Sequence, residues 1–477
     1  MEKAGRREWL GLAVLVLPTL LVAMDMTALF LALPQLSDDL GASSTEQLWI
    51  TDSYGFVVAG FVITMGTLGD RIGRRRLLLA GGAAFGVLSV VAAFSVSPEM
   101  LIVVRGALGV AGATLMPSTL ALITNMFPDG RQRGKAISIW ATCQFAGGAA
   151  GPVFAGFLLQ HFAWGSVFLV AVPAVALLLA AGPFLLPEFR APSSGRLDFA
   201  GVALSLAAVL LIVFGLKQLA TGAWVLPLAA IAAGTLLGVV FTRRQLSAET
   251  PLLDLRLFRN RPFTAVLVAL VVAGVAMAGV GLLVTQYLQS VLGHSPLVSA
   301  VLFAPMGLGV AAGTMTAPAL TRFTTPATAI AGGLVVSAAG SLLLTVGGGL
   351  PLVMAGIAVL TLGTGPLFAL GIGLVVGSVP PERAGSAASM ADTGNYLGGS
   401  LGMALIGLTA TAVYHAMFPA GTTLAADVTR PEVAEQAKAA FTTAVNVTGV
   451  LAALLFAGLA LLVRTLCRTP AAAPVRV

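Results

Sequence analysis

The chain has 477 residues, of which 58% are hydrophobic and only 9% are charged, and its formal net charge is +7. This composition excludes a soluble globular protein, because soluble domains carry about 25% charged residues. The positive charge does not indicate a nucleic-acid partner, since the basic residues stand in short segments between long apolar stretches.

Apolar stretches of about 20 residues, long enough to cross a bilayer as helices, recur along the whole chain. The first is too long for the core of a signal peptide, so we count it as a helix. The predicted fold is therefore all-α and integral to the membrane, with fourteen transmembrane helices. Their expected spans are 9–34, 47–68, 77–97, 99–122, 134–159, 164–187, 197–217, 223–242, 262–288, 297–320, 326–347, 351–378, 384–414 and 441–464.

These spans suggest three parts. Residues 1–187 and 261–477 each form a predicted bundle of six helices, and residues 188–260 add two inserted helices and a linker. Leucines alternate with charged residues over 252–259 in that linker, which predicts a short helix at the membrane surface. The longest outer loop, 415–440, is polar.

The distribution of basic residues predicts the orientation. An even number of spans places both termini on one side, and 22 of the 26 Lys and Arg residues fall in segments on that side. Only Arg430 and Lys438 fall in the opposite loops. By the positive-inside rule both termini are cytoplasmic. The excess of Arg over Lys, with abundant Ala, Gly and Val, is typical of a GC-rich bacterial genome, so we expect a bacterial cytoplasmic membrane.

Three carboxylates lie within apolar spans: Asp25, Asp52 and Asp392. Each charge at the centre of a membrane helix costs roughly 2.5–3.5 kcal/mol, and such residues usually carry protons or hold a charged substrate. Asp25 and Asp52 lie at similar depths, about 13 Å and 10 Å from the outer surface at 1.5 Å per residue, so they can share one cavity. The three acids indicate an ion-coupled transporter.

We assign proton transport first to Asp25, because apolar surroundings raise the affinity of a carboxyl group for protons. The alternative is an aspartate permanently bonded to a neighbouring threonine or to the backbone. Arg105 is the only basic residue deep in the first bundle. It is expected to pair with an acid or a carbonyl and to tune the proton site, or to have a purely structural partner.

Asp52 shares a helix face with Trp49 and Phe56, at spacing i, i+3, i+7. An acid beside two aromatic rings suits a lipophilic cation, although Trp49 is equally well read as a residue of the interfacial aromatic belt. In the second bundle, Asn395 and Tyr396 lie on the face of Asp392, which predicts substrate or proton binding or else a structural hydrogen-bond cluster. Weaker candidates for the pocket are Trp140, Gln144, Gln286 and Tyr287.

The loop GTLGDRIGRRR, residues 66–76, combines small residues with one acid and four bases. Its glycines permit close backbone contact and a tight turn. An acid and a base at a bundle interface form a latch that breaks when the bundles move, although a simple basic loop is the alternative. The residues of this predicted cytoplasmic gate are Gly66, Gly69, Asp70, Arg71, Gly73 and Arg74.

With this loop, the sequence resembles the major facilitator superfamily, and within it the proton-driven drug exporters with fourteen helices, including the Qac-type multidrug exporters. Further matching segments are MDMTALFLALP (24–34), LIVVRGALGVAGA (101–113), GGAAGPVFAG (147–156) and PLLDLRLFRNRPF (251–263). Two departures are Ala155, where glycine is common, and the second bundle, where 309–326 lacks the acid of the loop motif.

The resemblance implies a proton-coupled antiporter that exports lipophilic cations such as quaternary ammonium compounds and dyes by alternating access. It also implies that the antiporter motif, Gly147, Gly151, Pro152 and Gly156, bends its helix and biases the protein towards export. Close packing of small residues is the alternative for this motif.

A dedicated exporter of one endogenous metabolite or antibiotic would use the same machinery. A membrane-embedded enzyme would need clustered ligands or catalytic groups, and neither Cys143 and Cys467 nor the three histidines have that spacing. A scaffold or sensor would need a sizeable soluble domain. The chain has no GxxxxGK[ST] loop for ATP. We therefore expect no catalytic residues, metal or cofactor, no nucleic-acid partner, and a monomer that contacts lipid, protons and lipophilic cations.

Overall fold

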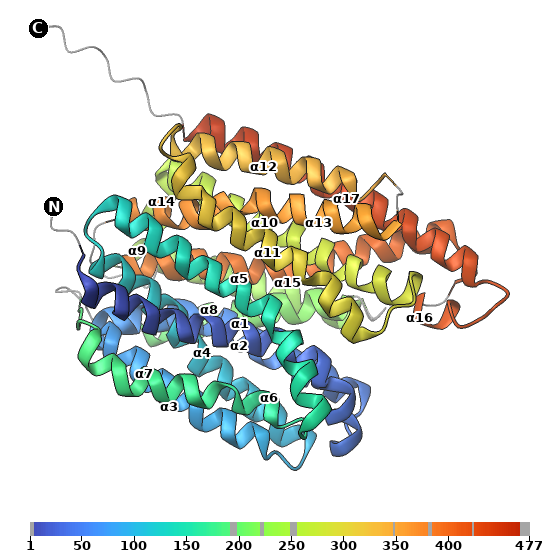
Figure 1. Cartoon of the computed structure of the whole chain (residues 1–477), viewed down its shortest axis with the longest axis horizontal. Coiled ribbons are helices and arrows are strands. Elements are labelled where there is room, and N and C mark those ends of the chain that lie inside the picture. The colour runs from blue at the N-terminus through green and yellow to red at the C-terminus, as the bar shows by residue number, and fades with distance from the viewer. Residues whose placement is uncertain are drawn as a thin grey trace, which may run out of the picture.

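The computed structural model describes residues 4–190, 198–219, 224–248, 255–346, 349–379, 384–421 and 424–467. Inside these ranges, the side chains of Asp52, Asp392 and Tyr396 are among those that lie outside the described residues. Every regular element of the described chain is helical (Figure 1).

The N-terminal group consists of helices α1 to α7. Their bounds are α1 Arg6–Leu40, α2 Ser44–Ile72, α3 Arg74–Ala93, α4 Pro98–Met126, α5 Gly130–His161, α6 Ser166–Leu169 and α7 Ala171–Leu185. Two inserted helices follow, α8 Phe199–Leu219 and α9 Val225–Ser247, and then the short 3-10 helix η1 Leu255–Arg259. This last element stands in the linker where the sequence predicts a surface helix.

The C-terminal group consists of α10 to α17. Its helices are α10 Arg261–Gln286, α11 Pro296–Leu320, α12 Pro326–Leu343, α13 Gly349–Pro366, α14 Ile372–Gly377, α15 Ala384–Met417, α16 Leu424–Asp427 and α17 Ala434–Leu466, with π-helical turns η2 Tyr287–Val291 and η3 Leu367–Gly371.

Polar caps fix where several of the long apolar helices begin. The Ser43 hydroxyl accepts a hydrogen bond from the backbone N–H of Glu46, and the Glu46 carboxylate accepts one from the backbone N–H of Ser43. At the start of α5, the Asp129 carboxylate accepts a hydrogen bond from the backbone N–H of Gln132. These caps satisfy N–H groups that the first turn of a helix leaves free, so the polar residues between apolar stretches set the helix boundaries.

Among the described residues, eleven helices are long and apolar enough to cross a membrane, or twelve if the bent α2 counts as one span. Shorter apolar helices cover Ala200–Ile212 in α8 and Leu401–Met417 in α15. Each of the fourteen expected spans falls on one of these helices, but the number fourteen stays a prediction.

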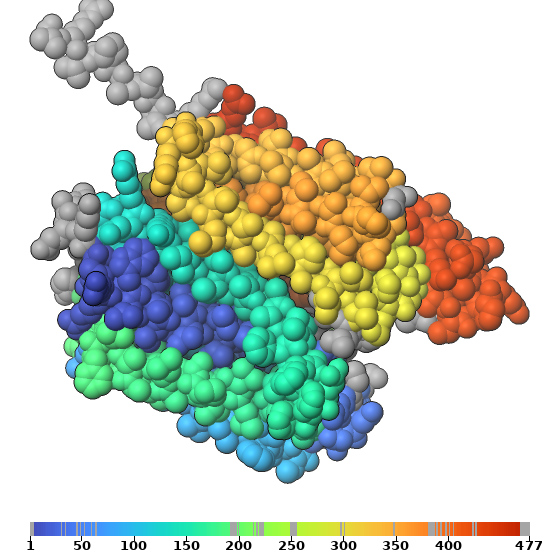
Figure 2. Space-filling model, in the orientation of Figure 1, coloured from blue at the N-terminus to red at the C-terminus, as the bar shows by residue number. Residues whose placement is uncertain are grey.

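The two groups meet along two seams. Helices α1, α4, α5 and α7 pack mainly within the N-terminal group, and α10, α12, α13 and α17 within the other. Contact between the groups runs through α5 with α11 and through α2 and α4 with α15. Figure 2 shows α5 and α11 side by side on the visible face.

Two side-chain pairs join the groups at the α5–α11 seam. The hydroxyl oxygens of Thr142 and Thr314 are 2.7 Å apart, and the rings of Phe145 and Phe368 have centroids 4.7 Å apart. A movement of one group against the other must break or remake these contacts.

The described chain begins and ends at the same end of the molecule (Figure 1), which we call the terminus side.

Candidate functional site

A buried ion pair joins α1 to α4 inside the N-terminal group. Nη1 of Arg105 lies 2.5 Å from Oδ2 of Asp25, and Nε of Arg105 donates a hydrogen bond to the Ile50 carbonyl at 3.2 Å. The guanidinium also lies over the ring of Tyr54, 4.7 Å from its centroid. Arg105 thus contacts an acid, a carbonyl and an aromatic face at once, and it links α1, α2 and α4.

The two members of this pair differ slightly in exposure. The Arg105 side chain is 1% exposed and the Asp25 side chain 11%. A buried charge is tolerated when it is paired and hydrogen-bonded, and Arg105 meets that condition. The carboxylate is thus the more exposed member of the pair, and it is the only one of the two that can change its charge, because arginine stays protonated in proteins.

Two glycines let α4 approach α2 closely enough for this geometry. A Cβ on Gly112 would lie 2.6 Å from the Tyr54 hydroxyl oxygen, and one on Gly109 would lie 2.7 Å from the Tyr54 carbonyl oxygen. Real Cβ atoms are essentially never found so close to another atom. Small residues at positions 109 and 112 therefore place Tyr54 beside Arg105.

The glycines of the predicted antiporter motif pack α5 onto α1. A Cβ on Gly147 would lie 2.5 Å from the Leu20 carbonyl oxygen, and one on Gly151 would overlap the hydroxyl of Thr27. Pro152 lies within α5, and Gly156 is buried. Close packing is therefore one function of the motif, and it takes place against the helix that carries Asp25.

The other predicted pocket residues, in α5, α10 and the adjoining η2, lie in different surroundings. Trp140 is fully buried, and its Nε1 donates a hydrogen bond to the Thr119 hydroxyl at 3.0 Å, an arrangement that favours packing over substrate contact. Gln144 is half-buried and Gln286 is exposed. Tyr287 lines a cavity of about 20 Å³ formed with α12, α13 and α17, inside the C-terminal group.

Trp49 and Phe56 lie together on α2, with ring centroids 6.2 Å apart. Trp49 also faces Phe214 of α8, a residue that the sequence did not single out. Asp52 stands between Trp49 and Phe56 along the backbone of α2, but its side chain lies outside the described residues. The same holds for Asp392 and Tyr396 in α15, where Asn395 is half-buried.

The predicted gate loop is held together within the N-terminal group. Nε and Nη2 of Arg74 donate hydrogen bonds to Oδ1 of Asp70 at 2.9 and 2.6 Å, and the Arg74 side chain is fully buried. Gly66 and Gly69 are buried beside this turn, and Arg71 is half-buried.

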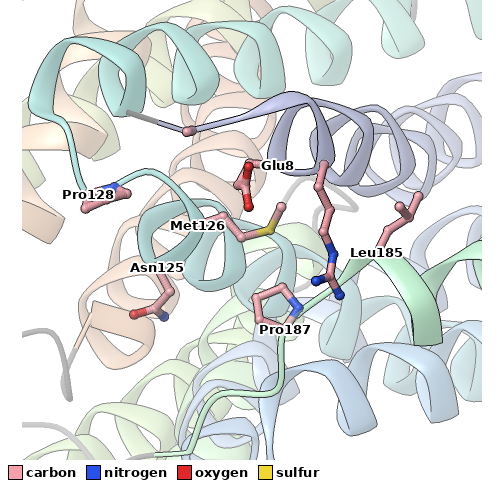
Figure 3. A pocket seen from close by; sticks show the side chains of 8 residues that line it. Glu8, Asn125, Met126, Pro128, Leu185 and Pro187 are labelled. Atoms are coloured by element: carbon pink, nitrogen blue, oxygen red, sulfur yellow. The ribbon is translucent and has the colours of Figure 1, made fainter. Parts of the chain in front are cut away.

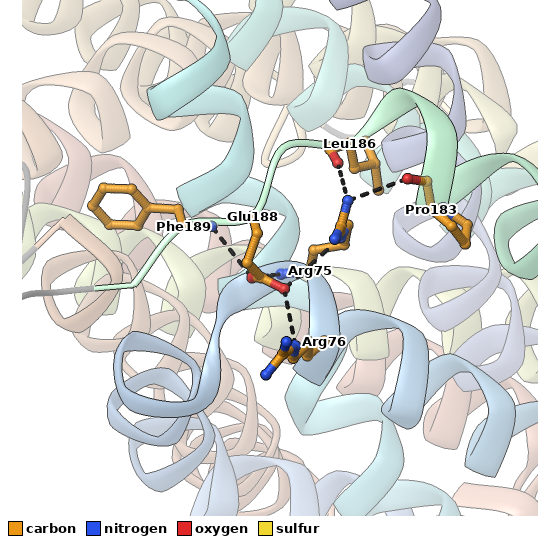
Figure 4. Close-up of polar contacts among 6 residues, drawn as sticks. All are labelled: Arg75, Arg76, Pro183, Leu186, Glu188 and Phe189. Carbon is orange, nitrogen blue, oxygen red and sulfur yellow. Dashed lines mark hydrogen bonds and ion pairs between the residues drawn. The ribbon is translucent and has the colours of Figure 1, made fainter.

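Glu188, beyond the end of α7, completes this arrangement (Figure 4). It accepts a hydrogen bond from the Arg75 backbone N–H at 3.1 Å and lies within 3.8 Å of the charged groups of Arg75 and Arg76. Gly73 has a positive φ of 112°, and a Cβ there would lie 2.5 Å from Oε1 of Glu188. The sequence missed Glu188, because Arg75, to which it is hydrogen-bonded, lies 113 residues away along the chain.

Figure 3 shows a surface cavity of about 530 Å³ at the terminus side, formed by the start of α1 and the ends of α4 and α7. Arg7 and Glu8 line it with opposite charges. Asp25 lies 17 residues beyond Glu8 on α1, about 25 Å away at 1.5 Å per residue. The cavity is therefore separate from the ion pair.

A further buried acid, which the sequence did not single out, lies in α16 on the side opposite the termini. Asp427 is fully buried, and the Tyr414 hydroxyl donates a hydrogen bond to its Oδ2 at 2.8 Å. Nη1 of Arg430 is 3.6 Å from Oδ1. The sequence predicts a loop over 415–440, but helices α15 and α17 extend into that range, and the segment between them contains an internal polar cluster that ties α16 to α15.

In the described part of the chain, no group of three or more His, Cys, Asp or Glu residues is arranged to hold a metal ion. Cys143 and Cys467 are both free thiols.

Comparisons with known proteins agree with this architecture. The family model described as Major Facilitator Superfamily matches residues 15–403. The chain is 41% identical to the multidrug efflux pump LfrA of Mycolicibacterium smegmatis, over 94% of each chain. It is 34% identical to the methyl viologen resistance protein SmvA of Salmonella typhimurium, over 87% of this chain and 85% of that one.

The solved structure of the human organic anion transporter MFSD10 superposes with a TM-score of 0.66 at 17% identity, over 94% of this chain and 99% of the other. At that identity the likeness shows a shared fold. Together with the helical structure, these comparisons confirm the predicted all-α membrane fold class and the resemblance stated from the motifs.

Proposed function

Since this chain belongs to the major facilitator superfamily and is a transporter rather than an enzyme, we propose that it is a proton-coupled antiporter that exports lipophilic, mainly cationic drugs. Two six-helix bundles, residues 1–187 and 261–477, would alternately open a central cavity to each side of the membrane. The relatives support drug export, because one is named a multidrug efflux pump and another a methyl viologen resistance protein.

The ion pair of Asp25 and Arg105 carries the proposal of proton coupling. A protonated Asp25 loses its charge attraction to Arg105, and a deprotonated Asp25 regains it at 2.5 Å. Because Arg105 also contacts α2, proton exchange at one carboxylate would change the forces among three helices. A single titratable group can in this way couple proton transfer to helix movement.

The balance of charge within the spans supports a cationic substrate. Asp25, Asp52 and Asp392 lie in membrane helices, whereas Arg105 is the deep base of the N-terminal group and is already paired. We propose Asp52 and Asp392 as sites for the substrate cation or for further protons, with Asn395, Tyr396 and the aromatic residues of α2 beside them. Carboxylates attract a cation and repel an anion, and both effects are stronger in surroundings of low dielectric constant.

Two further roles belong to this proposal. The turn from Gly66 to Arg74 would act as a cytoplasmic gate, with both termini in the cytoplasm as the distribution of basic residues predicts. The bend and close packing at Pro152 and Gly151 would favour one orientation of α5 against α1. The protein would work as a monomer in a bacterial cytoplasmic membrane.

The test is transport by the purified chain in liposomes with an imposed pH gradient. An interior that is acidic relative to the medium should drive uptake of a quaternary ammonium dye by inside-out molecules, and collapse of the gradient with a protonophore should stop it. Uptake at the same rate with and without the pH gradient would contradict proton coupling. If no lipophilic cation is transported, the alternative of a dedicated exporter of one metabolite or antibiotic gains support.

A further inference from the structure

The inserted hairpin of α8 and α9 contacts both helical groups. α8 packs against α2 of the N-terminal group and α15 of the C-terminal group, and α9 packs chiefly on α8. The approach to α2 is close, because a Cβ on Gly60 would lie 2.8 Å from a methyl group of Leu206. The hairpin therefore covers the seam at which α2 meets α15.

An ion pair holds the two hairpin helices together at the terminus side. Nε and Nη2 of Arg244 in α9 donate hydrogen bonds to the Asp198 carboxylate at 2.9 to 3.2 Å, and the Gly201 N–H donates to it at 2.9 Å. Asp198 caps the start of α8 and binds α9 at the same time. The hairpin thus presents α8 to α2 in one orientation.

At the opposite side of the membrane, α8 contributes a ring to an aromatic cluster that consists of Trp49, Phe56 and Phe214. The rings of Trp49 and Phe214 are close to parallel, with an interplanar angle of 22° and centroids 6.4 Å apart. Phe56 meets Trp49 edge-on, at 6.2 Å and 71°. Trp49 lies near the start of α2 and Phe214 near the end of α8, so the cluster lies close to the outer surface.

This cluster is accessible, unlike the buried tryptophan of α5. Trp49 is 37% exposed, whereas Trp140 has no exposed surface and a satisfied indole N–H. Aromatic faces attract cations within about 6 Å of their centroids. Two nearly parallel rings, with a third ring edge-on and part of their surface open, suit a lipophilic cation that moves between the membrane surface and the interior of the protein.

We propose that Trp49 and Phe214 form a recognition site for lipophilic cations, and that the α8–α9 hairpin takes part in substrate selection through Phe214. This inference rests on the proposed function, because it names a binding site on the route of the exported cation. The competing explanation is that both rings belong to the interfacial belt and only position the helices. Only the recognition site requires an aromatic face at residue 214 for binding of the cation.

The experiment compares Phe214→Leu with Phe214→Tyr in the full chain. Leucine keeps an apolar side chain but removes the aromatic face, whereas tyrosine keeps the face. Trp224→Leu is the matched control, since Trp224 is 60% exposed and precedes α9 on the same side of the membrane. The probe is ethidium, with uptake by proteoliposomes giving KM and kcat and with equilibrium binding to the detergent-solubilised protein as a second readout.

We expect Phe214→Leu to raise KM and the dissociation constant for ethidium about threefold to fivefold, with kcat within about twofold. Phe214→Tyr and Trp224→Leu should match the unsubstituted protein. The inference is overturned if Phe214→Leu leaves KM unchanged, if Phe214→Tyr is as defective as Phe214→Leu, or if Trp224→Leu has the same effect. If the unsubstituted chain transports no lipophilic cation, the proposed function fails and this inference fails with it.

Discussion

Among the described residues, two aspartate–arginine pairs are alike in burial and different in what they connect. In both pairs the arginine side chain is at most 1% exposed and the carboxylate is 11 to 13% exposed. Asp25 and Arg105 are 80 residues apart and link separate helices within the membrane, whereas Asp70 and Arg74 are four residues apart across a turn.

This difference shows that burial alone does not indicate function. The Asp70–Arg74 pair joins two residues on either side of one turn, and its hydrogen bonds involve neither α1 nor α4. The Asp25–Arg105 pair is a long-range contact, so a change in the charge of Asp25 alters how helices attract one another. We therefore place proton coupling at Asp25 and a supporting role at Asp70, and four substitutions test this contrast.

Arg105→Ala should have the largest effect. It leaves a carboxylate within the membrane without its partner and removes contacts to Ile50 and Tyr54, so we expect a loss of about 3–5 kcal/mol in stability and no coupled transport. Thermal unfolding in detergent and dye uptake by proteoliposomes are the measurements. Arg322→Ala, at an exposed arginine, is the control. A variant as stable and active as the control would contradict the account.

Asp70→Asn should have the next largest effect on stability. Arg74 stays buried with a neutral amide in place of a carboxylate, which weakens two charge-assisted hydrogen bonds by about 2–3 kcal/mol in total. Because the pair is local, dye-induced proton release should persist. The measurements are thermal unfolding and proton release in weakly buffered detergent solution. Loss of proton release with normal stability would reverse the roles assigned to the two pairs.

Glu188→Gln should lower stability less than Asp70→Asn does. Its contacts with Arg75 and Arg76 are partly exposed ion pairs at 3.7 to 3.8 Å, and such pairs contribute about 0–1 kcal/mol. Glutamine can still accept the hydrogen bond from the Arg75 backbone N–H. A fall in the melting temperature much larger than that of Asp70→Asn would show that Glu188 is the main support of the turn.

Asp198→Asn should have the smallest effect on stability, and this effect should depend on pH. Hydrogen bonds from Arg244 hold the pKa of Asp198 below its usual value. A lowered folded-state pKa means that the stabilisation is present above the ordinary carboxyl pKa, about 3.9, and is lost as the pH falls through the folded-state value. The unsubstituted protein should therefore exceed Asp198→Asn in melting temperature at pH 7 by a small margin. This margin should vanish in acid, and a margin that grew with acidity would contradict the assignment.

The sequence predicted the fold class well, because the length of each apolar stretch and the residues of the turns between them can be read from short segments of sequence. It also identified Asp25 and Arg105 as candidate functional residues, since a charged side chain within an apolar span has a high free-energy cost and is visible in the sequence. It left open whether Arg105 has an acid or a carbonyl as its partner. The structure gives it both, in Asp25 and Ile50.

Other contacts have no local signal. Nothing near Glu188 or Phe214 in the sequence distinguishes them from other acids or apolar residues. Only the packing of distant segments brings Glu188 to Arg75 and Phe214 to Trp49. Asp427 lies in a polar loop, where an acid is unremarkable until the loop folds onto Tyr414. A scan for charges within apolar spans finds none of these three residues.

The central claim is that proton exchange at Asp25 drives export. Proton release from the detergent-solubilised protein on addition of a quaternary ammonium dye tests it most directly, with Asp25→Asn compared with Asp70→Asn. The account predicts release from the unsubstituted protein and from Asp70→Asn, and none from Asp25→Asn, although that variant still binds the dye. Release from Asp25→Asn equal to that of the unsubstituted protein would contradict it.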